Sequence, residues 1–226
     1  MSDVATNLAE IHENIKAACD RSGRNVADVT LIAVTKTFSA DRVREAYDVG
    51  QIDVGENRLQ EAESKIPLLP ASMRWHYIGQ LQRNKVRKVL PLFAMVHSID
   101  SLRLAQYTNE VARELGLFPK IFLQINHADE ESKAGFSLED LHAQWETLLQ
   151  LDRLEIVGLM TVPPAVDDPE ESRPWFAALR ELRDQLSMGM NSPLPYLSMG
   201  MSGDYVVAIE EGATHIRVGS AIFGTR

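Results

Sequence analysis

The first apolar positions of the chain follow a helical spacing. Five small or apolar side chains recur every three or four residues before Gly23, and they are Val4, Leu8, Ile11, Ile15 and Ala18. This spacing places them on one face of a helix, and glycine commonly ends a helix because it adopts a left-handed backbone. The pattern therefore predicts an N-terminal amphipathic helix within residues 1–23 that packs on the rest of the protein.

The pattern then changes to short apolar runs that alternate with helical stretches. The eight predicted strands are Thr30–Thr35, Ile52–Val54, Trp75–Ile78, Met95–Ile99, Lys120–Ile125, Leu154–Met160, Tyr196–Ser198 and His215–Val218. Several of these runs, such as LIAV and IVGLM, are apolar on consecutive positions. Strands buried on both faces of a parallel sheet have this character.

Helix signals fill the intervals between the strands. Ser39 and Ser137 are predicted N-caps, the first for a helix over Arg42–Tyr47 that Gly50 ends. A third helix is predicted to begin between Asp168 and Pro174. The expected buried stripes of the later two helices are Leu138, Leu141, Trp145 and Leu148, and Trp175, Leu179, Leu182 and Leu186.

Eight strands that alternate with helices are the elements of an α/β fold of the (β/α)8 TIM-barrel type. No Pro/Gly/Ser-rich linker interrupts the alternation, so residues 1–226 are predicted to form a single domain. The sequence predicts no helix after the eighth strand, and the N-terminal helix is expected to cover that seam. The alternative is an open doubly wound sheet, which usually has glycines after its first strand. Here that turn is TKTFSA, without glycine.

Composition narrows the class of protein. The net charge of −9 argues against a nucleic acid as the main partner, because such binding depends on neutralising phosphates. No apolar run approaches the roughly 20 residues of a membrane-spanning helix. The single cysteine, Cys19, can form neither an internal disulfide nor a multi-cysteine metal site. With an acidic, helical N-terminus in place of a signal peptide, we expect a cytoplasmic protein without a metal site.

In a barrel, chemistry belongs at the carboxyl ends of the strands. Lys36 follows the first strand, where loss of water would lower the pKa of its amine and favour a Schiff base with an aldehyde. The alternative is a lysine that extends to the rim or pairs with an acid. Asn57, after the second strand, is expected to cap a helix or to contact a ligand. His76 is expected to be a packed structural histidine, with acid–base chemistry as the alternative.

The loops after the last two strands contain glycine and serine, and they are Gly200 to Gly203 and Gly219 to Ser220. Barrels commonly bind phosphate at these two loops through backbone N–H groups. Arg217 has only hydrogen-bond donors, so it requires an acid, a phosphate or a ring nitrogen unless it lies at the rim. A basic stretch, Arg83 to Lys88, is expected to be a solvated face. An amine, a phosphate site and a cation together suit pyridoxal 5′-phosphate (PLP).

The sequence also resembles the pyridoxal phosphate homeostasis proteins, which are built like the barrel of alanine racemase without its second domain. The blocks that carry the resemblance run in order through the chain, and they are Ala33–Thr37, Gly55–Asn57, Gln60–Glu61, Trp75–Gly79, Leu81–Gln82, Asn84–Lys85, Gln124–Asn126, Lys133–Gly135, Gly158–Thr161, Leu197–Ser202, Arg217–Gly219 and Ala221–Gly224. Three positions depart from the family pattern, namely Thr35, Arg58 and Ser220. Thr35 and Ser220 keep a hydroxyl, whereas Arg58 replaces an aromatic residue.

The resemblance implies a role for six residues. Lys36 would hold PLP as a Schiff base, Ser202, Gly219 and Ser220 would bind its phosphate, Arg217 would face the pyridine nitrogen, and Asn57 would lie beside the cofactor. An arginine at that nitrogen disfavours ring protonation, and only Lys36 is clearly supplied as a base for racemisation.

We therefore expect a non-catalytic PLP-binding protein of intracellular PLP homeostasis. It is expected to be a monomer without nucleic-acid or membrane partners, and enzymes that lack their PLP are candidate recipients. The alternatives are a PLP-dependent amino-acid racemase or lyase, and a sugar-phosphate enzyme in which Lys36 acts as an aldolase-type amine.

Overall fold

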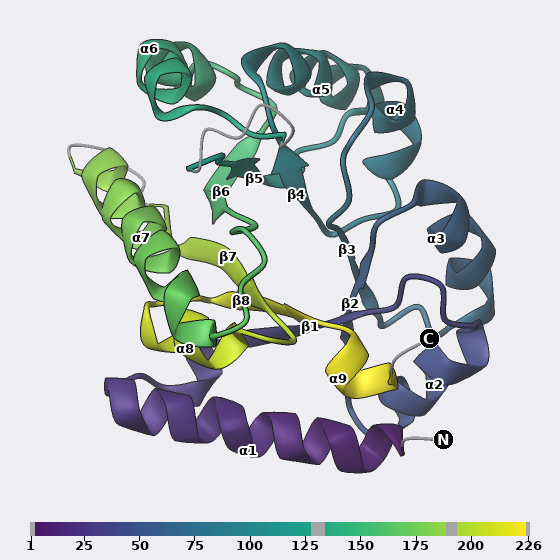
Figure 1. Cartoon of the computed structure of the whole chain (residues 1–226). Coiled ribbons are helices and arrows are strands. Elements are labelled where there is room, and N and C mark those ends of the chain that lie inside the picture. The colour runs from purple at the N-terminus through teal and green to yellow at the C-terminus, as the bar shows by residue number, and fades with distance from the viewer. Residues whose placement is uncertain (1–2, 128–133, 189–193, 225–226) are drawn as a thin grey trace.

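A computed structural model describes residues 3–127, 134–188 and 194–224 of the chain. Its strands pair in parallel in chain order, and the eighth pairs with the first to close a barrel. The strands are β1 (Thr30–Val34), β2 (Asp53–Glu56), β3 (Arg74–Tyr77), β4 (Met95–Ile99), β5 (Lys120–Gln124), β6 (Glu155–Met160), β7 (Tyr196–Met201) and β8 (His215–Val218). The predicted barrel is confirmed, and the open doubly wound sheet is wrong (Figure 1).

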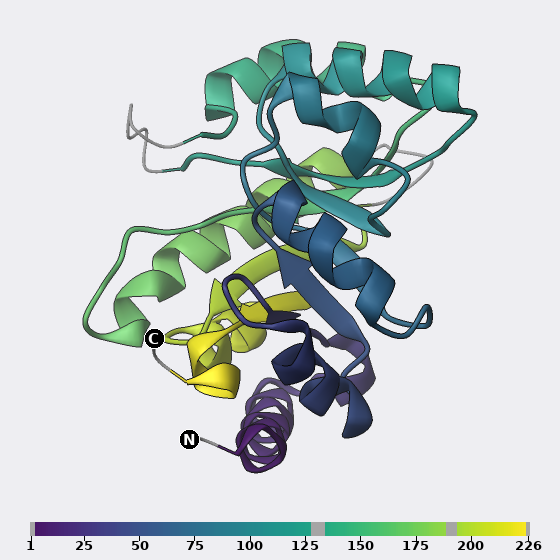
Figure 2. The ribbon, with the colours of Figure 1, turned by 90° about the vertical axis from the view of Figure 1, so that its right-hand side faces the viewer.

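Helices surround the barrel in both views (Figures 1 and 2). They are α1 (Val4–Ser22), α2 (Ala40–Asp48), α3 (Leu59–Lys65), α4 (Val86–Val89), α5 (Leu102–Leu115), α6 (Leu138–Leu149), α7 (Arg173–Ser187), α8 (Tyr205–Glu210) and α9 (Ser220–Phe223). Both predicted serine caps are confirmed, since the Ser39 and Ser137 hydroxyls accept hydrogen bonds from the N–H groups of Arg42 and Asp140. A serine at this position supplies the acceptor that the first helical turn lacks.

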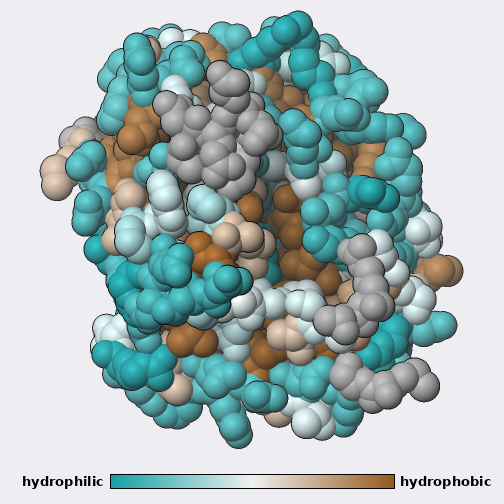
Figure 3. Space-filling view, viewed as in Figure 1, coloured by the Kyte–Doolittle hydropathy of each residue, from teal (hydrophilic) through white to brown (hydrophobic). Residues whose placement is uncertain are grey.

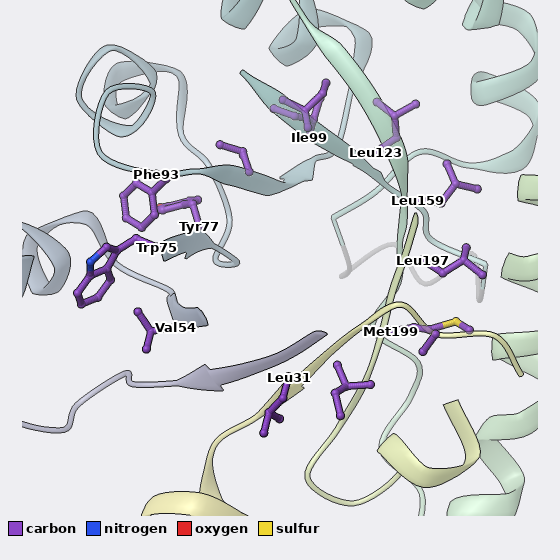
Figure 4. Packing of buried hydrophobic residues seen from close by; sticks show 14 of the residues in the cluster. Leu31, Val54, Trp75, Tyr77, Phe93, Ile99, Leu123, Leu159, Leu197 and Met199 are labelled. Atoms are coloured by element: carbon purple, nitrogen blue, oxygen red, sulfur yellow. The ribbon is translucent and has the colours of Figure 1, made fainter. Parts of the chain in front are cut away.

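The strands alternate between two environments. Leu31, Trp75, Leu123 and Leu197 belong to the main hydrophobic cluster, in which strands pack against helices (Figure 4). Because neighbouring side chains of a strand point to opposite faces, the residues between these positions point into the barrel. Several of the inward residues are polar, and they are His76, His97, Ser198, His215 and Arg217. The barrel interior is therefore partly polar, which bears directly on the site.

Helix α1 closes the seam between the two ends of the chain. All five apolar positions of its predicted stripe are buried. The Asn7 amide donates to the carbonyl of Ile222 at 2.8 Å, and Arg21 forms an ion pair with Glu210 at 2.7 Å. The expected covering of the seam is thus confirmed. The prediction that no helix follows the eighth strand is wrong, because α9 adds one helical turn that packs on α1.

Several predicted boundaries and core positions are also wrong. Strand β1 ends at Val34 and β2 extends to Glu56, so the turn after each strand is displaced from its predicted position. In α6, Leu138 is 41% exposed, whereas Phe136 before the cap is buried. In α7, Trp175 is only half-buried and Phe176 is fully buried. Helical spacing predicts which face of a helix is apolar, but at the edge of that face it does not decide which of two nearby residues is buried.

The surface in the view of Figure 3 is mainly hydrophilic, with smaller hydrophobic areas between the polar side chains. None of the helices in the described ranges is both long and apolar enough to span a membrane.

Candidate functional site

A pocket of about 690 Å³ lies at the carboxyl ends of the strands. Its lining includes all six residues that the sequence singles out for binding, namely Lys36, Asn57, Ser202, Arg217, Gly219 and Ser220. Phe38, Ile78 and Val162 add apolar walls. The side chains come from the ends of several different strands, which is the usual construction of a ligand site in this fold.

Lys36 lies in the turn after β1 and is exposed. Within the described ranges, its ammonium group forms neither an ion pair nor a hydrogen bond. Of the two parts of the alternative for Lys36, pairing with an acid is therefore wrong, whereas extension to the rim agrees with the exposed side chain. The expected loss of water is not seen either, because β1 ends two residues before Lys36 and leaves the side chain beyond the rim of the barrel. The amine thus lies at the mouth of the pocket, free to react with a ligand.

The turn that carries Lys36 is strained. Thr37 has a φ of 67°, and it is the only non-glycine residue in the described ranges with a positive φ. A β-branched residue rarely adopts this left-handed backbone, which costs about 1–3 kcal/mol. The Thr37 N–H donates to the Glu61 carboxylate at 2.6 Å, and this bond holds the strained turn in place. The backbone beside Lys36 is therefore fixed by contacts rather than by its own preference.

A buried ion pair supports the same turn from behind. The Lys65 ammonium donates to the Thr35 carbonyl at 2.7 Å and to the Glu56 carboxylate at 2.6 Å. The Thr35 hydroxyl donates to the same carboxylate oxygen at 2.6 Å. Burial raises the pKa of Glu56 in spite of these donors. These contacts fix the residue that precedes Lys36.

The sequence did not predict the ion pair between Glu56 and Lys65. Glu61 and Lys65 are spaced like a helical ion pair, which was the one available signal. Glu56 ends β2 in a fully buried position, and nothing in its neighbourhood along the chain indicates that it meets Lys65 there.

Asn57 does not cap α3. Arg58 takes the N-cap position, and no side chain accepts a capping hydrogen bond there. The Asn57 side-chain oxygen is buried and has no hydrogen-bond partner among the described residues. The backbone at Asn57 packs closely against Gly79, which only a glycine permits, since a Cβ atom on residue 79 would lie 2.0 Å from the Asn57 carbonyl oxygen. Of the two predicted roles of Asn57, the structure favours contact with a ligand, because unpaired buried polar atoms are rare.

The loops after β7 and β8 bring donors together. The N–H groups of Gly219 and Ala221 both point to the Ser202 hydroxyl oxygen, at 3.2 and 3.5 Å. Asp204 shapes the first loop by accepting a hydrogen bond from the Met201 N–H at 2.6 Å. Ser202, Gly203, Gly219 and Ser220 all line the pocket. The two N–H groups already donate to Ser202, so this corner of the pocket offers mainly the hydroxyl groups of Ser202 and Ser220 to an anionic or polar ligand.

Arg217 is the buried cation of the pocket, with 4% of its surface exposed. Its guanidinium donates to the Ser198 hydroxyl at 2.7 Å and to the Thr161 carbonyl at 2.8 Å. Burial lowers the pKa of Arg217 to about 10, so the group stays charged at neutral pH. No carboxylate of the described residues forms an ion pair with it. Two of the alternatives predicted for Arg217, a position at the rim and a pairing with an acid, are thus wrong.

His76 is buried in a polar network inside the barrel. Its ring nitrogens lie 3.0 Å from Asp53 and 3.0 Å from His97, and neither histidine lines the pocket. The structural role expected for His76 is therefore favoured over direct acid–base chemistry. Burial lowers the pKa of His97 well below its usual value and lowers the pKa of His215 to about 3.

The buried His215 predicts loss of stability in acid. Its pKa is about 3 in the folded protein and about 6.5 when unfolded, so below pH 6.5 the unfolded chain takes up a proton that the folded chain does not. Stability falls by up to about 1.4 kcal/mol per pH unit, or about 2 kcal/mol at pH 5. Urea denaturation of the wild type and of His215→Phe at pH 7 and pH 5 measures this. A flatter pH dependence in the variant is expected, and equal slopes would contradict the assignment.

Comparisons with known proteins agree with this architecture. Residues 6–226 match the family model described as "Alanine racemase, N-terminal domain". The pyridoxal phosphate homeostasis protein of Pseudomonas aeruginosa is 43% identical over 228 residues, which cover 100% of this chain and 97% of the relative. That of Aquifex aeolicus is 40% identical over 220 residues, which cover 97% and 96%.

Two solved structures of similar fold match nearly the whole chain. PipY of Synechococcus elongatus, solved without PLP, is 39% identical and superposes with a TM-score of 0.87 over 98% of this chain and 100% of that chain. PipY with PLP bound superposes with a TM-score of 0.85 over the same shares. By full-length sequence identity and by barrel structure, the chain belongs to the pyridoxal phosphate homeostasis protein family, whose barrel is that of the alanine racemase N-terminal domain.

Proposed function

We propose that this protein binds pyridoxal 5′-phosphate in the pocket at the carboxyl ends of the strands and serves in the homeostasis of that cofactor. The observation that carries the proposal is the meeting of the unpaired Lys36 side chain, the buried cation of Arg217 and a corner formed by the glycine and serine residues after β7 and β8 in one pocket. The proposal draws further support from relatives named for this role and from PipY, which was solved with PLP bound. Residues 1–226, with α1 at the seam, would form one binding domain.

The residues present fit the cofactor. The unpaired oxygen of Asn57 indicates a missing partner in the pocket, and the hydroxyl groups of Ser202 and Ser220 beside Gly219 suit a phosphate. When bound, PLP supplies an aldehyde that joins an amine and a ring that withdraws electrons once its nitrogen is protonated. Lys36 would provide the amine, while Ser202, Gly219 and Ser220 would hold the phosphate.

Arg217 would face the ring nitrogen. With a pKa of about 10, it keeps its proton at neutral pH and donates a hydrogen bond without transferring a proton. Lys36 and Arg217 are also the only lining residues in the described ranges with ionisable side chains. A racemase needs a proton donor or acceptor on each face of its substrate, and this pocket offers one reactive base. We therefore infer a binding protein without catalytic turnover rather than a racemase.

A titration with PLP tests the proposal. We expect an absorbance band near the edge of the visible range that saturates at one PLP per chain. Incubation of the loaded protein with L-alanine, followed by chiral analysis, is expected to show no D-alanine. Failure to bind PLP would overturn the proposal, and racemisation at enzymatic rates would restore the racemase alternative. In cells, PLP-dependent enzymes that lack their cofactor are the proposed recipients, and the protein is proposed to act as a monomer.

The phosphate corner predicts strong discrimination between PLP and pyridoxal. Charge-assisted hydrogen bonds contribute roughly 1.5–3 kcal/mol each, so the loss of two such bonds to the phosphate weakens binding by about 100-fold or more. The aldehyde is common to both compounds and cannot account for a difference of this size. Equilibrium titration of the same protein with each compound measures the ratio. Equal affinities would show that Ser202, Gly219 and Ser220 do not bind phosphate.

A further inference from the structure

A chain of hydrogen bonds crosses the interior of the barrel from Arg217 to Asp53. Arg217 donates to the Ser198 hydroxyl at 2.7 Å, and that oxygen lies 2.8 Å from Nδ1 of His97. Nε2 of His97 lies 3.0 Å from Nδ1 of His76, and Nε2 of His76 lies 3.0 Å from the Asp53 carboxylate. We call these five residues the interior chain. Since β4 and β7 are not neighbours in the barrel, the bond between His97 and Ser198 must cross its interior.

The two ends of the interior chain lie in different cavities. Arg217 lines the pocket described above. Asp53 and His76 line a second cavity of about 590 Å³, together with the first residues of β1, β3 and β8, which are Thr30, Arg74 and His215. That cavity therefore lies at the amino ends of the strands. The interior chain connects the ligand pocket with the opposite end of the barrel.

The chemistry of the ends fixes the direction of every hydrogen bond. Arg217 can only donate, and the Asp53 carboxylate can only accept. Burial raises the pKa of Asp53, but hydrogen bonds from His76 and Arg74 outweigh that effect and lower it, so Asp53 is ionised. His76 therefore donates from Nε2 to Asp53. At the other end, the Ser198 oxygen accepts from Arg217, so its own hydrogen donates to Nδ1 of His97, and a neutral His97 then donates from Nε2 to Nδ1 of His76.

The same donor and acceptor roles extend to Arg217 at the other end of the interior chain. Nδ1 of His97 then accepts from the Ser198 hydroxyl, whose oxygen accepts from Arg217. Each link then holds one hydrogen. Full burial, with the neighbouring His76, His215 and Arg217, lowers the pKa of His97 and favours this state. No member is left without a partner, as a buried polar network requires.

We propose that Ser198, His97 and His76 are positioning residues that fix the orientation of Arg217 toward the ligand. This inference rests on the proposed function, in which Arg217 donates to the cofactor ring. Ser198 and the Thr161 carbonyl hold the guanidinium through two of its five N–H groups. Both acceptors are neutral, so they orient Arg217 without a carboxylate to neutralise its charge. The interior chain gives the Ser198 oxygen its acceptor role, because His97 takes up the hydroxyl hydrogen.

The hydrogen positions are tested first, in the full-length wild type without cofactor. Nitrogen-15 NMR of histidine-labelled protein at pH 7 distinguishes the two neutral tautomers of each ring. We expect His97 to be protonated on Nε2 only and His76 likewise. A His97 protonated on Nδ1, or a charged His97, would overturn the proposed direction of the interior chain whatever the protein binds.

The positioning role is tested by Ser198→Ala, which removes the hydroxyl and leaves both Arg217 and His97 without their shared partner. We expect PLP to bind about tenfold more weakly or worse, the loss that accompanies one hydrogen bond to a charged group. We also expect the absorbance maximum of bound PLP to shift, because the donor at its ring changes orientation. Thr108→Val is the matched control, since it removes a buried hydroxyl in α5 that bonds only the Leu104 carbonyl.

Ser198→Thr keeps the hydroxyl and is expected to retain most of the affinity and the wild-type spectrum. If wild type binds PLP but Ser198→Ala matches Thr108→Val in affinity and spectrum, the positioning role is overturned and the proposed function stands. If wild type itself fails to bind PLP, the proposed function fails, and the NMR result still decides the direction of the interior chain.

Discussion

Lys36→Ala is expected to abolish the covalent attachment of PLP and its absorbance band while the barrel stays folded. Lys36 is exposed and makes no ion pair in the described ranges, so its removal leaves no buried group without a partner. Exposed substitutions of this kind usually change stability by less than about 0.5 kcal/mol. Thermal unfolding without PLP is therefore expected to match the wild type, and reduction with borohydride is expected to leave no adduct.

The control is Lys85→Ala, which removes another lysine and is expected to keep both the band and the adduct. Peptide mapping of the reduced wild-type protein should place the adduct on Lys36. An adduct on Lys85, or on Lys133, which lies outside the described residues, would show that the amine at the pocket mouth is not the reactive one.

Lys65→Met is expected to destabilise the protein by about 3–5 kcal/mol, the usual loss when one partner of a buried ion pair is removed. Lys65 and Glu56 are only 8% and 0% exposed at their side chains. Without the ammonium, Glu56 keeps a buried charge with only the Thr35 hydroxyl as a donor. Urea denaturation at pH 7 measures the loss. Lys16→Met removes an exposed pair with Asp20 and is expected to change stability by less than about 1 kcal/mol.

The same variant has a predictable pH dependence. The pKa of Glu56 is already raised by burial, and loss of Lys65 raises it further. A carboxyl group whose pKa is higher in the folded state binds protons more tightly there, so stability falls as the pH rises through that range. The defect of Lys65→Met is thus expected to be largest at neutral pH and to shrink as the pH falls toward 4. Adding Glu56→Gln should recover part of the loss at pH 7, and a defect that is independent of pH would contradict this account.

The sequence was most informative where function depends on local pattern. Runs of buried apolar residues predicted all eight strands, and the rule that barrels bind ligands at strand ends located the pocket around Lys36 and Arg217. The glycine and serine positions after β7 and β8 were visible for the same reason. Strand ends and the edges of helical stripes were less certain, because a shift of one residue changes the pattern little.

What the sequence could not predict depends on distant partners. Glu56 and Lys65 meet because β2 and α3 pack together, and His97 bonds Ser198 from 101 residues away across the barrel. The strain at Thr37 likewise follows from a contact with Glu61 in another element. None of these residues carries a local signal for its partner. They surround the predicted site and determine its backbone and charge.

The seam at α1 also has a consequence for how the protein forms in the cell. The Asn7 amide and its partner, the Ile222 carbonyl, are 215 residues apart in sequence. At about 5–20 residues per second, a ribosome needs roughly 10–45 s to make the intervening chain. During that time the apolar face of α1 has neither α8 nor α9 to cover it, and β1 lacks its neighbour β8. The barrel can therefore close only after synthesis of β8, and α1 is fully covered only once α9 is made; until then the nascent chain displays the kind of apolar helix face that chaperones bind.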